Sequence, residues 1–111
     1  MTKRTKMPRV SIIIPSYNYA NYIEACLQSV VDQTYEDFEV LVIDDGSADN
    51  SVEIISRFLT DPRIRLLENP ENIGIAATQN RGIAESSGEF ICVLNADDLW
   101  LPEKLNEQVA F

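Results

Sequence analysis

Four short apolar runs, separated by segments with helical periodicity, constrain the fold of this chain more than any other feature. The runs are Val10–Ile14, Phe38–Ile43, Ile64–Leu67 and Phe90–Leu94. Each is continuous or rich in β-branched residues, which is typical of strands that are covered on both faces. We therefore expect four buried strands, each followed by a helix.

The segments after the runs carry apolar residues at three- and four-residue spacing, the pattern of helices with one buried face. The first expected helix is marked by Ile23, Leu27, Val30 and Val31, and the second by Val52, Ile55, Phe58 and Leu59 after an N-cap region at Ser47 and Asp49. The third runs from Ile75 to Ser86, with Gly88 as its C-terminal cap. The fourth opens at Pro102 and has Leu105, Val109 and Phe111 on its inner face. The order β-α-β-α-β-α-β-α predicts an α/β fold, Rossmann-like, with a mostly parallel sheet flanked by helices.

The last expected helix has no stop signal, so we expect a truncated domain over residues 10–111. A basic, flexible tail is expected over residues 1–9. Lys3, Arg4, Lys6 and Arg9 lie there, and the tail could be a remnant of added sequence, a disordered end or a weak contact with a membrane surface.

The charge balance limits the kinds of ligand. The chain has 9 basic and 18 acidic residues, and residues 10–111 alone carry a net charge of −13. This argues against a nucleic-acid scaffold, which would show a basic face. An acidic domain that binds an anion generally needs a cation to do so, which favours a divalent metal.

Two residue types exclude further classes. The chain has no histidine, so it cannot build a His-based zinc site or a Ser-His-Asp triad by itself. Cys26 and Cys92 lie in apolar surroundings and are expected to be buried, reduced thiols. No apolar run approaches the roughly 18 residues of a membrane span, and no signal peptide is recognisable, so we expect a cytoplasmic protein.

Ligands of open parallel sheets bind outside the carboxyl ends of the strands. The segments at these ends are Pro15–Asn18, Asp44–Ser47, Glu68–Asn69 and Asn95–Asp98. Two of the four contain adjacent carboxylates, which repel one another unless a cation or hydrogen-bond donors compensate. Because neighbouring side chains of an extended chain point opposite ways, we expect one member of each pair to face a ligand.

Each acidic pair has two interpretations. Asp97–Asp98 either binds a divalent cation completed by a diphosphate, or caps the helix that opens near Pro102. Asp44–Asp45 either accepts a hydrogen bond from a nucleobase or ribose, or belongs to a turn in which Gly46 supplies backbone freedom.

Other residues near the carboxyl ends of the strands also allow more than one interpretation. Tyr17 either lays its ring on a base or joins a surface aromatic cluster with Tyr19 and Tyr22. Gly74 either lets a helix N-terminus approach phosphate or is a turn glycine. Asn80 and Arg81 are expected on a solvated helix face, and Trp100 and Pro102 in packing. No G-x-G-x-x-G or G-x-x-x-x-G-K-[ST] motif is present, which counts against a dinucleotide-binding domain and a P-loop NTPase.

In this order and spacing the motifs resemble family 2 inverting glycosyltransferases of the GT-A fold. The segments that carry the resemblance are Val10–Asn18; Gln33-Thr34-Tyr35 leading to Asp44-Asp45-Gly46-Ser47; Asn72-Ile73-Gly74 with Asn80-Arg81-Gly82; and Gly88–Ile91 leading to Asn95–Pro102. The resemblance covers nearly the whole chain from Val10 onward.

The resemblance implies a donor-binding half that holds a nucleotide-diphosphate sugar, most simply a UDP-sugar. The nucleotide-binding residues it implies are Pro15, Tyr17, Asn18, Asp45, Gly74 and Asp97, with Asp97 and Asp98 as ligands of Mn²⁺ or Mg²⁺. The acceptor would be a saccharide or a lipid-linked saccharide, in polysaccharide or cell-envelope synthesis. The enzyme would be cytoplasmic, either free or peripheral at the inner face of the membrane.

The chain departs from the family pattern in three places. Asn95 stands where the family usually has an aspartate, and the usual arginine near Thr78–Gln79 is absent or shifted to Arg81. The family's general base lies well beyond the metal motif, so no catalytic residue is assigned and the base is expected beyond Phe111. The chain alone is therefore expected to be inactive.

Two alternatives remain at this point. One is a non-catalytic nucleotide-binding fragment that self-associates through an exposed sheet edge. The other is a sugar-nucleotide nucleotidyltransferase, which would usually carry a Gly-rich, basic loop after the first strand.

Overall fold

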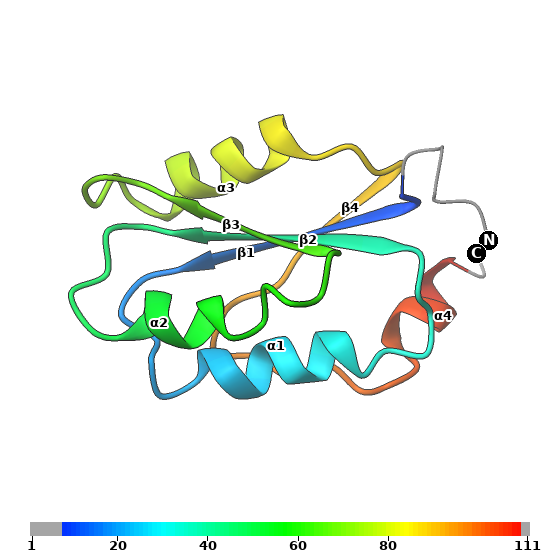
Figure 1. Cartoon of the computed structure of the whole chain (residues 1–111). Helices are drawn as coiled ribbons and strands as arrows, with labels where there is room; N and C mark the ends of the chain where they lie inside the picture. Colours follow the sequence, from blue (N-terminus) through cyan, green and yellow to red (C-terminus); the bar gives the residue numbers. More distant parts are fainter. Residues whose placement is uncertain (1–7, 110–111) are drawn as a thin grey trace.

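A computed structural model describes residues 8–109 and shows a parallel four-stranded sheet flanked by helices (Figure 1). The strands are β1 (Val10–Ser16), β2 (Phe38–Asp44), β3 (Ile64–Glu68) and β4 (Phe90–Val93), in the sheet order β3-β2-β1-β4. All three pairings are parallel. The predicted α/β architecture is therefore confirmed. Three strands extend one or two residues beyond the predicted apolar runs, and β4 ends one residue early.

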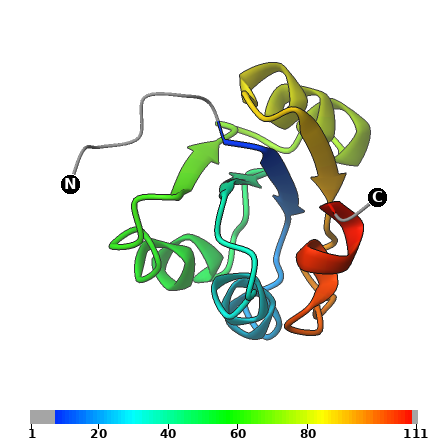
Figure 2. The same cartoon turned by 90° about the vertical axis from the view of Figure 1, so that its right-hand side faces the viewer.

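Helices cover the sheet unequally. Figures 1 and 2 show α1 (Ile23–Val31), α2 (Ser51–Ser56) and α4 (Lys104–Val109) on one side and α3 (Ile75–Glu85) on the other. β1 is buried along all its length because it lies between β2 and β4 with helices on both faces. Its side chains alternate: Ile12 and Ile14 join the large core under α1 and α2, and Ile13 joins the smaller core under α3.

Close contact between α3 and the sheet depends on Gly82. A Cβ at this position would lie 2.6 Å from the side chains of Ile13 and Ile43. The missing side chain lets the helix approach the two central strands, which brings its N-terminus to their carboxyl ends.

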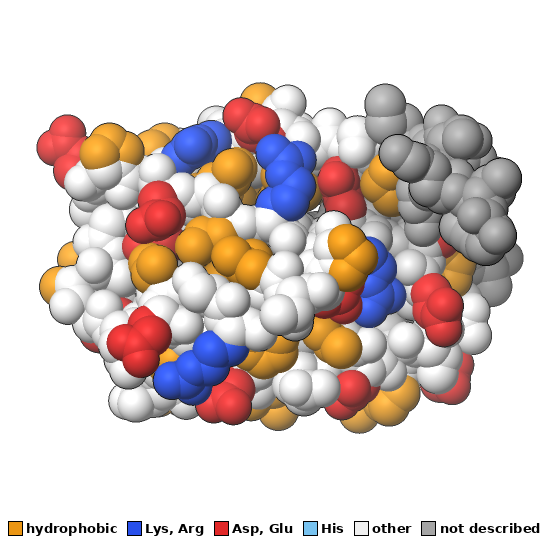
Figure 3. All heavy atoms as spheres, in the orientation of Figure 1, with side chains coloured by type: hydrophobic (Ala, Val, Ile, Leu, Met, Phe, Trp, Pro, Cys, Tyr) orange, Lys and Arg blue, Asp and Glu red, His pale blue; other side chains and the backbone are white. Residues whose placement is uncertain are grey.

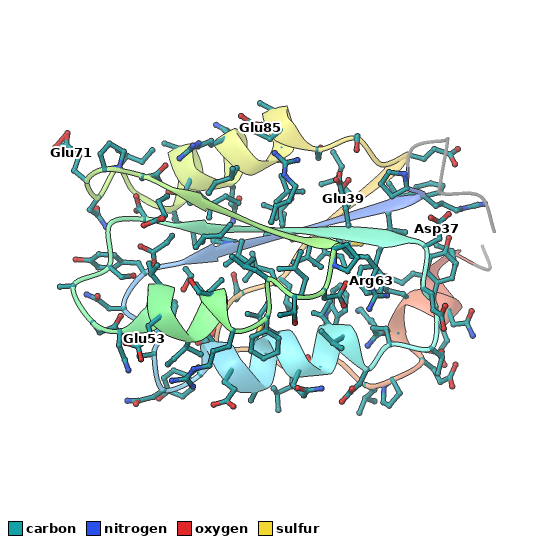
Figure 4. The ribbon with its side chains drawn as sticks, viewed as in Figure 1. Asp37, Glu39, Glu53, Arg63, Glu71 and Glu85 are labelled. Carbon is teal, nitrogen blue, oxygen red and sulfur yellow. The ribbon has the colours of Figure 1, made fainter. Side chains whose placement is uncertain are left out.

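A half-buried carboxylate anchors the opposite end of β1. Glu39 of β2 accepts hydrogen bonds from the Ser11 hydroxyl at 2.5 Å and from the Ser87 backbone N–H at 2.7 Å. Figure 4 shows Glu39 directed toward the side of the sheet that carries α3. The Gly88 N–H donates to Ser11 Oγ at 2.8 Å, so the connection from α3 into β4 is held against β1.

This contact corrects the predicted role of Gly88. The helix α3 ends at Glu85 with Ser86 as its C-cap, and Gly88 does not adopt a positive φ. A Cβ on Gly88 would lie 2.7 Å from the Ser11 backbone nitrogen. Close backbone packing, a tertiary requirement, explains this glycine.

Two helices differ from the periodicity pattern. α2 ends at Ser56, so Phe58 and Leu59 lie in the turns that follow, and Leu59 is exposed. The predicted N-cap region is present in a modified form, because Asp49 Oδ1 accepts the Ser51 N–H at 3.0 Å although Asn50 is the formal N-cap. α4 begins at Lys104, two residues after Pro102.

The prediction that every strand is covered on both faces is wrong for β4. Phe90, Ile91 and Val93 are 43–49% exposed. The physical reason is that β4 is the edge strand of the sheet. A groove of about 290 Å³ between β4 and α4 is lined by Ile91, Cys92 and Leu105 among others.

Both cysteines are free, as predicted. Cys26 is buried, and Cys92 is only half-buried because it lies on β4. Arg9 is described and places its guanidinium 5.3 Å from the centre of the Phe90 ring. The other tail residues named above, Lys3, Arg4 and Lys6, lie outside the described part of the chain, as does Phe111.

Within residues 8–109, none of the helices has the length and apolar character needed to cross a membrane. On the face shown in Figure 3, Lys and Arg side chains are separated by acidic and neutral ones, so this face carries no continuous basic surface.

Candidate functional site

The carboxyl ends of β1 and β2 and the start of α3 enclose a cleft of about 210 Å³ (left in Figure 1). Its lining residues are Pro15, Ser16, Tyr17, Tyr19, Asp45, Asn72, Gly74, Ile75 and Thr78. Parallel strands bring their carboxyl ends to one edge, so residues up to 63 positions apart in sequence meet here. The cleft unites four of the predicted nucleotide-binding residues: Pro15, Tyr17, Asp45 and Gly74.

Asp45 is the buried carboxylate of the cleft, with 3% of its surface exposed. Its Oδ1 accepts hydrogen bonds from Asn69 Nδ2 at 2.9 Å and from the Ile73 N–H at 2.8 Å. Its Oδ2 accepts one from the Gly74 N–H at 3.0 Å. Since each carboxylate oxygen has about two acceptor positions, Oδ1 is filled, whereas Oδ2 receives one donor from residues 8–109.

These donors set the ionisation of Asp45. Burial by itself would raise the pKa of the carboxyl, but hydrogen bonds from the Ile73 N–H, the Asn69 side chain and the Gly74 N–H bring the pKa below its ordinary value. The group is therefore a stable carboxylate at neutral pH, and an acceptor of hydrogen bonds only.

The neighbouring Asp44 has a different role. It is also buried, but its oxygens accept the Ser47 N–H at 2.9 Å and the Ser47 hydroxyl at 2.6 Å, and it does not line the cleft. Thus one member of this pair faces the cleft, as expected. Gly46 adopts φ +72° and a Cβ there would lie 2.9 Å from the Asn72 nitrogen, so the turn interpretation also holds.

Tyr17 and Asn18 follow β1 directly, but only Tyr17 lines the cleft. Tyr17 is 44% exposed and lines the cleft, whereas the edge-to-face contact of this region is between Tyr19 and Tyr22. Asn18 adopts φ +56°, and its Oδ1 accepts the Ala48 N–H at 2.8 Å. Asn18 therefore holds the turn before α2 and is not among the residues that line the cleft.

Gly74 serves as the N-cap of α3 with φ +95°, a conformation that favours glycine. The space where its Cβ would stand is open, with no atom of the described chain within 4 Å apart from the adjoining backbone. Gly74 is thus both a turn glycine and an open point on the wall of the cleft, and it leaves the first turn of an 11-residue helix accessible there.

Asp97 and Asp98 lie in the loop after β4 and do not line the cleft. Both are exposed, and the Asp98 N–H donates to the Asn95 carbonyl at 2.9 Å. Their carboxylates accept no hydrogen bond or ion pair from the described residues, so the structure gives no support to the helix-cap interpretation. Nor do any three His, Cys, Asp or Glu side chains of residues 8–109 gather into a ready metal cage.

The charge of this pair acts on a nearby thiol. Burial, followed by the charges of Asp98 and Asp97, raises the pKa of Cys26 to about 12. Cys26 Sγ lies 3.7 Å from the Asn95 carbonyl oxygen, so the loop sits over the start of α1. The thiol is therefore protonated and unreactive at neutral pH.

Sequence reasoning missed the polar network behind Asp45. Asn69 Nδ2 also contacts Thr78 Oγ1 at 3.1 Å, and Arg81 Nη1 donates to Asn69 Oδ1 at 2.7 Å and to the Glu68 carbonyl at 3.0 Å. Arg81 was expected on a solvated face. The one available signal was an asparagine at the carboxyl end of an apolar strand.

A second missed residue is Gln33, which is 5% exposed. Its Nε2 donates to the Leu101 carbonyl at 2.7 Å and its Oε1 accepts the Leu105 N–H at 3.0 Å. Gln33 thereby ties the segment after Asp98 to the end of α1. Trp100 packs against the large core, as predicted for it.

Comparisons with known proteins now bear on this site. The profile of glycosyl transferase family 2 matches residues 11–111. An Escherichia coli relative, "UDP-Glc:alpha-D-GlcNAc-diphosphoundecaprenol beta-1,3-glucosyltransferase WfgD", is 44% identical over 101 residues, which are 91% of this chain and 40% of that protein.

Two solved structures share the fold. Staphylococcus aureus TarS 1–349 in complex with UDP-GlcNAc superimposes with a TM-score of 0.88 at 28% identity, over 92% of this chain and 30% of TarS. The mannosyltransferase PcManGT from Pyrobaculum calidifontis, in complex with GDP-Man and Mn²⁺, gives a TM-score of 0.86 at 33% identity, over 95% and 32% of the two chains. The chain therefore spans between 30% and 40% of the length of these proteins.

We predict that Asp45→Asn lowers the free energy of unfolding at pH 7 by about 2 kcal/mol, because an amide nitrogen would face backbone N–H donors. The stabilisation by the carboxylate is present above the unfolded pKa of about 3.9 and is lost as the pH falls through the lower folded pKa. The difference in free energy of unfolding between the parent and Asp45→Asn should therefore become smaller below about pH 4. Urea unfolding from pH 7 to 3 measures this difference.

Asp97→Asn is the matched control, since it removes the same charge from an exposed side chain and should change stability by less than about 0.5 kcal/mol. Equal losses for both variants would contradict the role given to the Asp45 hydrogen bonds.

Proposed function

The chain belongs to glycosyl transferase family 2, and from this premise we propose that the protein transfers a sugar from a UDP-sugar to an acceptor hydroxyl with inversion. This chain would supply the donor-binding part of a GT-A fold. The observation that carries the proposal is the buried, ionised Asp45 in a cleft at the carboxyl ends of β1 and β2. TarS in complex with UDP-GlcNAc and the glucosyltransferase relative that uses UDP-Glc support the choice of donor.

Hydrogen bonding favours uracil over cytosine as the base. Asp45 Oδ2 has an acceptor position left and Asp45 can only accept, so it suits a base edge that presents an N–H. The N3 atom of uracil carries a hydrogen, whereas the N3 atom of cytosine carries a lone pair. The exposed ring of Tyr17 on the same cleft offers a surface on which the base can stack.

The phosphates would lie toward the start of α3. Backbone N–H groups in the first turn of a helix attract anions, and Gly74 leaves the approach to this turn open. Pro15 forms part of the opposite wall of the cleft. Asn18 would act indirectly, through the turn that its side chain holds.

The residues after β4 fit a divalent metal. Asp97 and Asp98 are adjacent, exposed carboxylates without a partner among residues 8–109, and hard cations such as Mg²⁺ commonly take one or two carboxylates together with phosphate oxygens. Mn²⁺ or Mg²⁺ held there would stabilise the charge on the departing diphosphate. PcManGT in complex with Mn²⁺ supports this assignment. Asn95, with a neutral amide, would contribute less than an aspartate.

Inversion requires a base to deprotonate the acceptor hydroxyl as it attacks the anomeric carbon. None of the residues that line the cleft is free for this, because Asp45 is held by three donors. We propose that the general base lies outside this chain. The chain alone would then bind the sugar donor without transferring the sugar.

The acceptor in this proposal is a saccharide or a lipid-linked saccharide. The Escherichia coli relative, whose name specifies a diphosphoundecaprenol-linked GlcNAc acceptor, supports the lipid-linked case. A cytoplasmic location, peripheral at the inner face of the membrane, and a role in cell-envelope polysaccharide synthesis belong to the same proposal.

One observation favours a second property, self-association. Ile91 and Val93 of β4 are exposed, and β4 has no neighbouring strand on its outer side within residues 8–109. An exposed apolar edge is a surface on which a second copy can pair. The nucleotidyltransferase alternative has no comparable support, because Pro15–Asn18 is neither Gly-rich nor basic.

We predict that UDP binds more tightly than CDP by at least about tenfold, because Asp45 Oδ2 would meet the N3 lone pair of cytosine. In Asp45→Asn this preference should largely disappear, since an amide can either donate or accept. Calorimetry in Mn²⁺ gives both dissociation constants. Glu71→Gln is the control, because Glu71 is exposed at the rim and points away from the molecule (Figure 4). Equal binding of UDP and CDP to the parent would contradict the base assignment.

We predict that Asp98→Ala strongly weakens the Mn²⁺-dependent part of UDP binding, because it removes one of the two carboxylates that we assign to the cation. Titrations of UDP with and without Mn²⁺ measure this part. Glu89→Ala removes an exposed carboxylate just before the start of β4, at the end of the strand away from Asp98. This variant should bind UDP as the parent does. Metal-independent UDP binding in the parent would contradict the metal assignment.

We predict that this chain, expressed as residues 1–111, self-associates with increasing concentration and that Ile91→Lys reduces the association, because a charge on an edge strand opposes pairing. Light scattering measures the mass. Ile83→Lys places the same charge on the exposed face of α3 and should leave the association unchanged. A monomer at all concentrations would contradict this prediction.

A further inference from the structure

Arg81 differs from the three arginines nearest to it in sequence. Arg57, Arg63 and Arg65 each pair with a carboxylate, on Glu53, Asp61 and Glu85 respectively. Arg81 makes no such ion pair within residues 8–109. Its Nη1 donates instead to two neutral oxygens, the Glu68 carbonyl at 3.0 Å and Asn69 Oδ1 at 2.7 Å. Glu85, one turn after Arg81 on α3, pairs with Arg65 instead.

The contact decides which way the Asn69 amide faces. A guanidinium donates hydrogen bonds and accepts none, so it selects the oxygen of the amide. The nitrogen of Asn69 must then face the other way, where it lies 2.9 Å from Asp45 Oδ1 and 3.1 Å from Thr78 Oγ1. A reversed amide would place an oxygen against the Asp45 carboxylate and a nitrogen against the guanidinium. Asn69 is 5% exposed, so water offers it little compensation.

The orientation of Asn69 in turn positions the Asp45 carboxylate. With Asn69 Nδ2 and the Ile73 N–H on Oδ1, the carboxylate is held with its other oxygen, Oδ2, toward Gly74 and the cleft. Arg81 itself does not line the cleft.

We propose that Arg81 is a positioning residue of the donor site, which orients Asn69 and through it holds the Asp45 carboxylate ready to accept a hydrogen bond from the base. This inference rests on the proposed function, because it concerns the same cleft and the same ligand. It assigns Arg81 to recognition of the base and not to direct contact with phosphate.

The test compares Arg81→Met, which keeps the aliphatic stem and removes the donors, with Arg57→Met, which removes an equally charged side chain on α2. Calorimetry on the intact protein gives dissociation constants for UDP, and competition against UDP gives those for uridine. We expect Arg81→Met to weaken uridine and UDP alike, on the order of tenfold, and Arg57→Met to change neither. The same titrations in an Asn69→Ala background should show no further loss from Arg81→Met.

The pH dependence of uridine binding gives a readout that loss of packing alone would not move. When Asn69 no longer donates to Asp45, the pKa of this carboxyl should rise, so binding in Arg81→Met should be lost at a higher pH than in the parent. If Arg81→Met does not fold, the same cycle is run with Arg81→Gln, which retains a neutral amide donor.

The outcomes separate the two proposals. Loss of UDP binding with uridine unchanged would assign Arg81 to phosphate and overturn the positioning role. An undiminished effect of Arg81→Met in the Asn69→Ala background, or an effect equal to that of Arg57→Met, would overturn it as well. If the parent protein binds neither uridine nor UDP, the proposed function fails first.

Discussion

The hydrogen bonds of Asp45 connect three parts of the chain that are distant in sequence. A carboxylate at 3% exposure must be compensated by donors, because an isolated buried charge would cost several kcal/mol. The donors come from Asn69 at the end of β3 and from the backbone of Ile73 and Gly74 before α3. One buried charge therefore sets the path of residues 69–74 and the place where α3 begins. The wall of the cleft and the open first turn of the helix follow from it.

The two acidic pairs show opposite uses of the same residue type. Asp44 and Asp45 are buried and supplied with donors by their own chain, so they organise a turn and a cleft without any added ion. Asp97 and Asp98 are exposed and receive no donor from the described chain, and their charges extend to the Cys26 thiol. The first pair is compensated by donors of its own chain, whereas the second receives none from residues 8–109, and this difference is why we assign the proposed cation to the second pair.

The packing behind the cleft is as specific as the cleft itself. Gly82 lets α3 lie against Ile13 and Ile43, and at the other end of the sheet Glu39, Ser11 and Gly88 hold the connection into β4. These contacts fix the C-terminal half of α3, and the connection that follows it, relative to β1 and β2. As a result, Tyr17, Asp45 and Gly74 line one cleft although they belong to segments that are distant in sequence.

The sequence by itself determined the order of strands and helices along the chain, because continuous apolar runs and a β-α alternation allow few topologies. It also predicted the edge of the sheet at which a ligand would bind. It also identified Tyr17, Asp45 and Gly74, since the ends of parallel strands can be counted along the chain. The tertiary structure decided which atoms those residues use. Asn18 was expected at the ligand but holds a turn, Gly88 was expected as a cap but packs against Ser11, and Arg81 was expected in solvent but orients Asn69. Each of these outcomes depends on a partner between 12 and 77 residues away, and local periodicity and propensity carry no information about such partners.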